Sequence, residues 1–191
     1  MHTKWSLRDV IFLALIGVFF GFIFWAWAFA YNAIAALLTP MGLSPYANDL
    51  TLGPWVMAGP MAGYLLRKAG ASIIGETLAG TAEMIFGSQW GIMNVVYGLM
   101  QGLGAELGFA LFGYKKWQPI SLTASVILTT VVTFIWDLFQ SGYANYSFGL
   151  LVGLFVTRLI SIALFGGVLV YYVQKLVDKS GILNQTKVTV S

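Results

Sequence analysis

Five ionisable side chains interrupt otherwise apolar stretches of the sequence, and they have the most capacity for chemistry. They are Glu76, Glu83, Glu106, Asp137 and Arg158. At the centre of a bilayer each costs on the order of 2.5–3.5 kcal/mol, so each needs a partner or a function. Glu76 and Glu83 are seven positions apart, which puts them on one face of a helix. These positions are therefore the first candidates for ion pairing or ligand binding.

The elements that carry these residues are predicted to be membrane-spanning helices. The 191 residues are 59% hydrophobic and only 9% charged, whereas a soluble domain carries roughly 25% charge. Lipid must therefore surround most of the surface. Residues 39–49, rich in Pro and Gly, are predicted as the longest polar loop. The apolar runs predict one all-α transmembrane domain over residues 1–180 and a flexible tail over 181–191, with six spans at about 7–38, 50–66, 71–86, 90–114, 119–139 and 148–177.

The basic residues alternate between the predicted loops. Lys and Arg occur at positions 4, 8, 67, 68, 115, 116, 158, 175, 179 and 187. All but Arg158 fall at the two ends of the chain or in the loops that follow the second and fourth spans. Positive charge collects on the cytoplasmic side of membrane proteins. The pattern predicts a multi-pass membrane protein with both termini in the cytoplasm.

Depth along the predicted spans divides the charged residues into two groups. Glu76, Glu106 and Arg158 fall in the inner half and predict a buried ion-pair network, because an unpaired buried charge is costly. Glu83 and Asp137 fall near the outer surface, with no basic residue at their depth. Either protons or solvent neutralise these two acids, or a bound cation balances them.

Aromatic and amide side chains gather at the same outer level. An interfacial aromatic belt explains some of the rings, but buried amides need hydrogen-bond partners. Carboxylates beside aromatic faces and amides suit a flat, cationic, hydrogen-bonding ligand. The predicted ligand-binding residues are Glu83, Asp137, Trp90, Asn94, Tyr97, Trp136, Gln140, Asn48, Asp49 and Trp55.

The composition disfavours several functional classes. The chain has no Cys, and its only His is His2. Zinc sites, Cys nucleophiles and histidine-based acid–base catalysis are therefore not expected. A P-loop pattern G-x-x-x-x-G-K-[ST] is also missing, so ATP binding by that route is not expected. We predict no catalytic residue, no metal and no cofactor.

Three segments of the sequence carry a resemblance to a known family. They are GETLAGTAEM at 75–84, GSQWG at 87–91 and WDLFQSGY at 136–143. The chain resembles the YkoE-type S-components, the substrate-binding subunits of energy-coupling factor (ECF) transporters that are associated with thiamine or its hydroxymethylpyrimidine part. The resemblance extends over nearly the whole chain. It implies a six-helix S-component bundle that captures the vitamin from outside, beneath the first outer loop.

The resemblance also implies partner proteins. An S-component works with a transmembrane T-component and two ABC-type ATPases, which would carry out the ATP hydrolysis. S-components often use an A-x-x-x-A patch on the first helix to dock to the T-component. Here Ala14 is followed four residues later by Val18, and the nearest pair of small residues is Gly17 and Gly21. The predicted partner interface is therefore Ala14, Gly17 and Gly21.

The implied ligand matches the predicted pocket. Thiamine carries a thiazolium cation and an aminopyrimidine that donates and accepts hydrogen bonds. We expect Glu83 to bind the aminopyrimidine or to offset the thiazolium, with Asp137 in the complementary role. This hypothesis requires an outer cavity whose negative charge nothing in the polypeptide cancels. The sequence leaves open which acid takes which role, and whether the ligand is thiamine or hydroxymethylpyrimidine.

Other functions remain possible from the sequence. Glu76 and Glu83 along one helix face could relay protons, as in a stand-alone ion- or proton-coupled secondary transporter of a small cationic solute. An intramembrane enzyme using the paired acids, or a purely structural subunit, would also contain buried acids. Uptake by the isolated chain in liposomes would favour the secondary transporter.

Overall fold

The structure is a computed structural model that describes residues 5–180, and helices dominate that part of the chain. The predicted tail at 181–191 lies outside the described residues, as do His2, Lys4 and Lys187. The helical elements are α1 (Leu7–Leu38), η1 (Thr39–Met41), α2 (Ser44–Trp55), α3 (Ala58–Leu66), α4 (Ala71–Ile85), α5 (Met93–Ala110), α6 (Pro119–Gln140), η2 (Tyr143–Asn145), α7 (Phe148–Ile162), the π-helical η3 (Ala163–Leu169) and α8 (Val170–Ser180).

Three stretches of the described chain are long and apolar enough to cross a membrane by length and composition. They are Leu7–Met41, Pro119–Gln140 and Phe148–Ser180. The first begins with a capping box, in which the backbone N–H of Asp9 donates to the Ser6 hydroxyl and the Ser6 N–H donates to the Asp9 carboxylate over 2.7 Å. Reciprocal capping satisfies backbone donors that a helix start otherwise leaves unpaired. The helix α1 is thereby fixed at its first turn.

Most of the predicted polar loop at 39–49 is helical instead. The helix α2 begins at Ser44 and has Pro45 in its first turn. Proline fits there because its fixed φ suits a helix start and its missing N–H would have no partner anyway. The prediction of a loop was wrong because it took this proline only as a helix breaker. After Pro54 the helix ends at Trp55, and α3 starts at Ala58.

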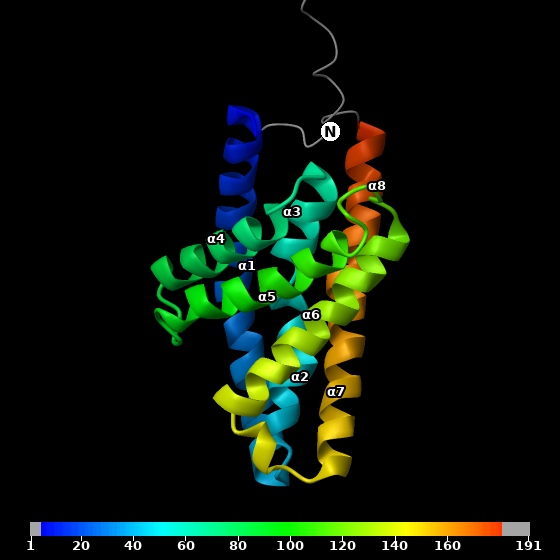
Figure 1. Ribbon diagram of the computed structural model, residues 1–191. Coiled ribbons are helices and arrows are strands. Elements are labelled where there is room, and N and C mark those ends of the chain that lie inside the picture. The colour runs from blue at the N-terminus through cyan, green and yellow to red at the C-terminus, as the bar shows by residue number, and fades with distance from the viewer. Residues whose placement is uncertain (1–4, 181–191) are drawn as a thin grey trace, which may run out of the picture.

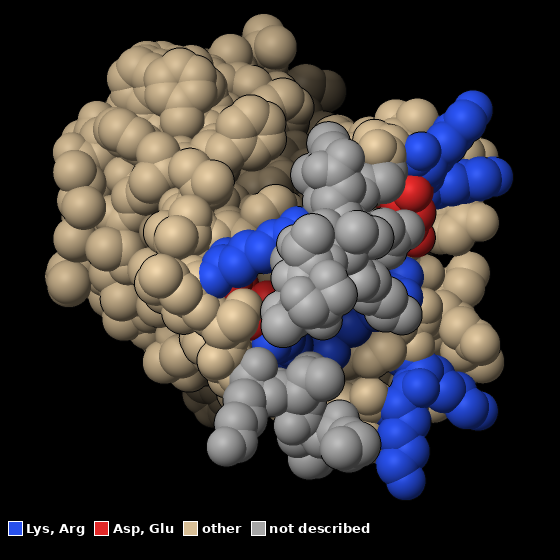
Figure 2. All heavy atoms as spheres, turned by 90° about the horizontal axis from the view of Figure 1, so that it is seen from above, with Lys and Arg blue, Asp and Glu red and all other residues tan. Residues whose placement is uncertain are grey.

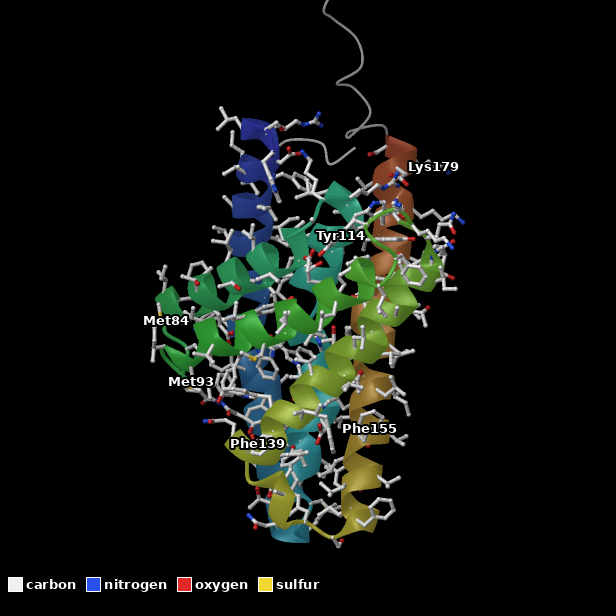
Figure 3. All side chains as sticks on the ribbon, viewed as in Figure 1. Met84, Met93, Tyr114, Phe139, Phe155 and Lys179 are labelled. Atoms are coloured by element: carbon white, nitrogen blue, oxygen red, sulfur yellow. The ribbon has the colours of Figure 1, made fainter. Side chains whose placement is uncertain are left out.

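The hairpin of α4 and α5 runs across α1 rather than along it (Figure 1). Met84 and Met93 mark the end of this hairpin at the side of the bundle (Figure 3). A Cβ on Gly17 would lie 2.7 Å from the Cβ of Leu78, and one on Gly21 would collide with Ala82. Small residues let helix backbones approach closely where lipid supplies no hydrophobic driving force. The glycines of α1 therefore form the crossing with α4.

This orientation overturns the assignment of depth from position in the sequence. Glu76 and Glu83 are separated along α4, and α4 lies across the long axis of the molecule (Figure 1). The two residues are therefore separated mainly across the long axis of the molecule, not along it. The prediction assumed that every helix follows the membrane normal, and α4 and α5 do not follow the direction of α1.

The N-terminal end of α1 and the C-terminal end of α8 lie at the same end of the molecule (Figure 1). Figure 2 looks onto this end, where Lys and Arg side chains gather. Two ion pairs join neighbouring elements there. Lys68 lies 2.5 Å from Asp9, and Arg67 lies 3.5 Å from Asp178. This basic end is opposite the end that holds η2 and the start of α2.

Candidate functional site

A cavity of about 340 Å³ lies among α1, α2, the α4–α5 hairpin, α6 and η2. Its volume is within the range of small-molecule sites, about 300–1,000 Å³. It lies toward the end of the bundle opposite the basic end (Figure 1). Eight of the ten predicted ligand-binding residues line it: Glu83, Asp137, Trp90, Asn94, Tyr97, Trp136, Asn48 and Trp55.

The other two predicted residues do not line the cavity. Asp49 is completely buried behind the cavity wall, where it holds Arg158. Gln140 is exposed at the last position of α6. It was predicted as one of the amides at the outer level, where buried amides need partners, but the last turn of α6 leaves it exposed. Neither side chain is therefore placed at the cavity wall in this structure.

Three aromatic rings, from α1, α2 and the turn between α4 and α5, form one wall of the cavity. Trp55 and Trp90 have ring centroids 5.4 Å apart at an interplanar angle of 88°. Tyr31 packs on both, at 5.7 Å from Trp55 and 5.5 Å from Trp90. The indole N–H of Trp55 donates to the carbonyl oxygen of Phe24 over 3.2 Å. These contacts fix the rings, which can then stack on a flat or cationic ligand without further ordering.

Glu83 lies beside this aromatic wall. It comes from α4, and only 4% of the residue is exposed. The Ser88 hydroxyl donates to its carboxylate over a long 3.4 Å, and the polar side chains of Trp55 and Asn94 lie next to the same carboxylate. Among the described residues, none of the ion pairs that Lys and Arg form includes Glu83. A carboxylate with such limited support retains capacity to bind a ligand.

Two buried donors on the cavity wall have no hydrogen-bond partner among the described residues. They are the amide nitrogen of Asn94 and the indole nitrogen of Trp136. Buried polar groups are nearly always hydrogen-bonded, so an unpaired donor in a cavity wall points to a ligand or to ordered water. Together with the Glu83 carboxylate, they offer a mixed set of donors and acceptors around one space.

A second polar region of the cavity is built around Asp137. The hydroxyl of Ser141 donates to one carboxylate oxygen of Asp137 over 2.6 Å. The amide of Asn48 donates to the other oxygen over 3.2 Å and lies 3.3 Å from the Tyr143 hydroxyl. The Tyr143 hydroxyl donates to Asp49 over 2.9 Å. These bonds join α2, α6 and η2 into one side of the cavity.

Arg158 lies behind this region and pairs with different acids from those predicted. Its Nε donates to Asp49 over 2.5 Å, and its Nη2 donates to Asp137 over 2.5 Å. The side chain is fully buried, and its guanidinium carbon lies 5.1 Å from the Phe134 ring centroid. The expectation that nothing cancels the charge of Asp137 is therefore wrong. Two carboxylates and one guanidinium carry a formal charge of −1, and Glu83 lies outside this network.

The predicted network of Glu76, Glu106 and Arg158 does not form. Glu76 accepts a hydrogen bond from the backbone N–H of Gly59, in the first turn of α3. Glu106 accepts from the N–H groups of Gly70 and Ser72, at the start of α4, over 2.7 and 3.0 Å. The first turn of a helix has unpaired N–H groups and favours negative charge. These two glutamates therefore pair N–H groups at the starts of α3 and α4.

The predicted partner interface is also corrected in part. Gly17 and Gly21 are buried against α4, so they are not available to another protein in this conformation. Ala14 is exposed on the outer face of α1. The prediction failed because close packing within the chain and packing against a partner use the same small-residue spacing.

Sequence reasoning missed several residues of the cavity wall. Tyr31 comes from α1, Thr133 comes from α6, and Ser141 caps the C-terminal end of α6. Thr133 and Ser141 lie four residues before and after Asp137, so helical spacing could have found them. Tyr31 had no comparable signal, because it lies in a long apolar helix and reaches the cavity only through the packing of α1 on α2.

A helical bundle that combines three stretches apolar and long enough to cross a membrane with an acidic, aromatic-lined cavity fits the class of solute-binding membrane proteins. Residues 8–132 match the family described as "ABC-type cobalt transport system, permease component". The chain is 33% identical over 184 residues to the "Putative HMP/thiamine permease protein YkoE" of Bacillus subtilis (strain 168), which covers 95% of this chain and 88% of that protein.

A solved structure gives the same result. The crystal structure of an S-component of an ECF transporter superposes with a TM-score of 0.84 at 32% sequence identity, covering 95% of this chain and 90% of that one. The chain therefore belongs to the YkoE-type family of S-components, the substrate-binding membrane subunits of ECF transporters.

Proposed function

We propose that the protein captures thiamine or its hydroxymethylpyrimidine part in the cavity and delivers it for ATP-driven uptake. The observation that supports this most is the position of Glu83, a buried carboxylate without a basic partner beside three fixed aromatic rings. In this proposal, a T-component and two ABC-type ATPases are the partners, and the ATPases supply the hydrolysis. The chain itself binds and releases the vitamin.

The cavity offers complementary groups for both parts of thiamine. Glu83 accepts hydrogen bonds from the aminopyrimidine or offsets the thiazolium, and Asn94 binds the polar edge of the pyrimidine. The rings stack against Trp90, Tyr97 or Trp136. Asp137 keeps part of its negative charge, because Arg158 is shared between two carboxylates. A cation is therefore attracted even though Arg158 lies behind the wall.

The aromatic lining favours an organic solute over the metal ion in the family description. A Co²⁺ site requires several imidazole, thiolate or carboxylate ligands around one point. The cavity instead presents indole and phenol rings, amides and two separated carboxylates. Binding of Co²⁺ with an affinity above that for thiamine would contradict this preference.

We further propose six crossings of a prokaryotic cytoplasmic membrane, with α4 and α5 strongly tilted and both termini in the cytoplasm. The basic end of the bundle supports this orientation, since positive charge favours the cytoplasmic side. The cavity then opens toward the outside, where a nutrient is captured. Release to the other side requires a movement that the partner subunits would drive.

Equilibrium binding of thiamine to the purified chain in detergent tests the proposed function. We expect saturable binding by the natural chain and at least tenfold weaker binding by Glu83→Gln. The matched control is Glu106→Gln, which makes the same chemical change outside the cavity and is expected to keep the affinity. Equal affinity of the natural chain and Glu83→Gln, with both folded, would remove Glu83 from the site.

A secondary transporter is the second candidate, because Glu76 and Glu83 are both buried on one face of α4. Reconstitution into liposomes distinguishes the two. The proposed function predicts accumulation of thiamine only with the T-component, the ATPases and ATP. Accumulation by the isolated chain under a pH gradient would favour the secondary transporter instead.

A further inference from the structure

Both polar regions of the cavity present a carboxylate. Glu83 lies near Ser88 at one side, and Asp137 lies with Asn48 and Ser141 at the other. None of the described residues that line the cavity is Lys, Arg or His. A ligand group that enters either region therefore meets an acceptor of negative charge.

Arg158 does not make the cavity less acidic toward a ligand, because its guanidinium already pairs with Asp49 and Asp137. Its Nε and Nη2 each contact a carboxylate at 2.5 Å, and none of its side chain is exposed. It therefore lies behind Asp137 and cannot reach a ligand in this conformation. The cavity and the wall behind it hold three acids and one base, a formal charge of −2 when all are ionised.

We propose that the cavity selects the free alcohol of its ligand and rejects the phosphate ester of the same molecule. The inference rests on the proposed function, since thiamine and hydroxymethylpyrimidine both end in an alcohol. A hydroxyl donates a hydrogen bond to a carboxylate and gains from its charge. A phosphate carries about two negative charges and strong acceptors at neutral pH, so it is repelled by the same group.

Each polar region acts in the same way on an alcohol that enters it, because each presents a carboxylate to the cavity. A site built to accept a hydrogen bond discriminates strongly against a group that cannot donate one, because buried polar groups are then left unpaired. The same carboxylates thus attract the cationic vitamin and exclude its esters.

Competition binding to the full chain tests the inference, with thiamine and thiamine monophosphate as the probes. We expect the monophosphate to bind at least tenfold more weakly than thiamine. Glu83→Gln and Asp137→Asn each remove one formal charge, so each should reduce the ratio of the two affinities, and the double variant should reduce it further. Asp178→Asn makes the same change at the basic end and should leave the ratio unaltered.

Each outcome of this experiment has a defined meaning. Equal affinity for thiamine and its monophosphate overturns the selectivity while leaving the proposed function intact. Failure of the natural chain to bind thiamine overturns both. A ratio that stays the same in Glu83→Gln and in folded Asp137→Asn contradicts the role of the carboxylates. Should Asp137→Asn fail to fold, Glu83→Gln alone decides that point.

Discussion

The buried acids of this chain differ in what holds them. Glu106 accepts two backbone N–H groups, and Asp49 accepts from Arg158 and Tyr143. Glu83 has a long 3.4 Å hydrogen bond from Ser88 and lies next to the Trp55 and Asn94 side chains. The protein completes the hydrogen bonds of Glu106 and Asp49, because an unsatisfied buried charge is costly. Glu83 differs from these two acids because it lines the cavity and has no basic partner there, as a ligand-binding acid requires.

At the residue scale we predict that Arg158→Met destabilises the protein by about 3–5 kcal/mol. The change leaves Asp49 and Asp137 buried beside each other without a cation, and breaking a buried pair has a cost of this size. Thermal unfolding in detergent measures the effect. Thr157→Ala, on the same helix, is the control and should shift the melting temperature little. A natural melting temperature for Arg158→Met would contradict the described network.

The sequence predicted the residue types of the cavity better than the pairing of its charges. Trp55, Trp90 and Asn94 were expected together because polar and aromatic residues collected near one set of helix ends. Arg158 was assigned to the wrong acids because Asp49 was placed in a loop. Which charges pair depends on where the helices cross. The pattern of hydrophobic residues in the sequence predicts helices but says little about where they cross.

Glycines set those crossings at the scale of the elements. Gly98 and Gly102 pack α5 on α4, and a Cβ on Gly104 would lie 2.6 Å from the Cα of Thr129 on α6. Each contact brings two backbones together, as small residues do in membrane bundles. The hairpin of α4 and α5 can therefore lie across the bundle and carry Glu83 to the aromatic wall.

We predict that Gly104→Ala destabilises the bundle by about 1–3 kcal/mol, because the added methyl group overpacks the crossing of α5 and α6. Gly149→Ala is the matched control. Gly149 lies in α7 with no atom near its Cβ position, so alanine there should leave stability unchanged or raise it by a few tenths of a kcal/mol. Equal melting temperatures for the two variants would contradict the described crossing.

The location of most helices could be predicted from apolar runs and breakers, and the bounds of α1 agree with the predicted 7–38. The tilt of α4 and α5 could not. A run of apolar residues indicates that a helix contacts lipid or core, but it does not give the direction of the helix. Direction is set by side-chain packing between elements that are far apart in sequence.

At the scale of the whole molecule, the basic end and the cavity end lie opposite each other (Figure 1). This arrangement suits a protein that binds a solute from one side of the membrane and releases it toward the other side. The chain contains no Cys. A single introduced cysteine is therefore the only thiol of the protein, and its labelling shows on which side of the membrane it lies. In intact cells, we predict that a membrane-impermeant maleimide labels Ser147→Cys but labels Lys116→Cys only after lysis. The reverse pattern would invert the orientation.

The most direct test of the central claim is an experimental structure of the chain determined with thiamine. The account predicts the vitamin in the cavity, with one of its rings against the wall formed by Tyr31, Trp55 and Trp90 and a polar group of the ligand within hydrogen-bond distance of the Glu83 carboxylate. Thiamine bound elsewhere on the protein, with the cavity unoccupied, would contradict it.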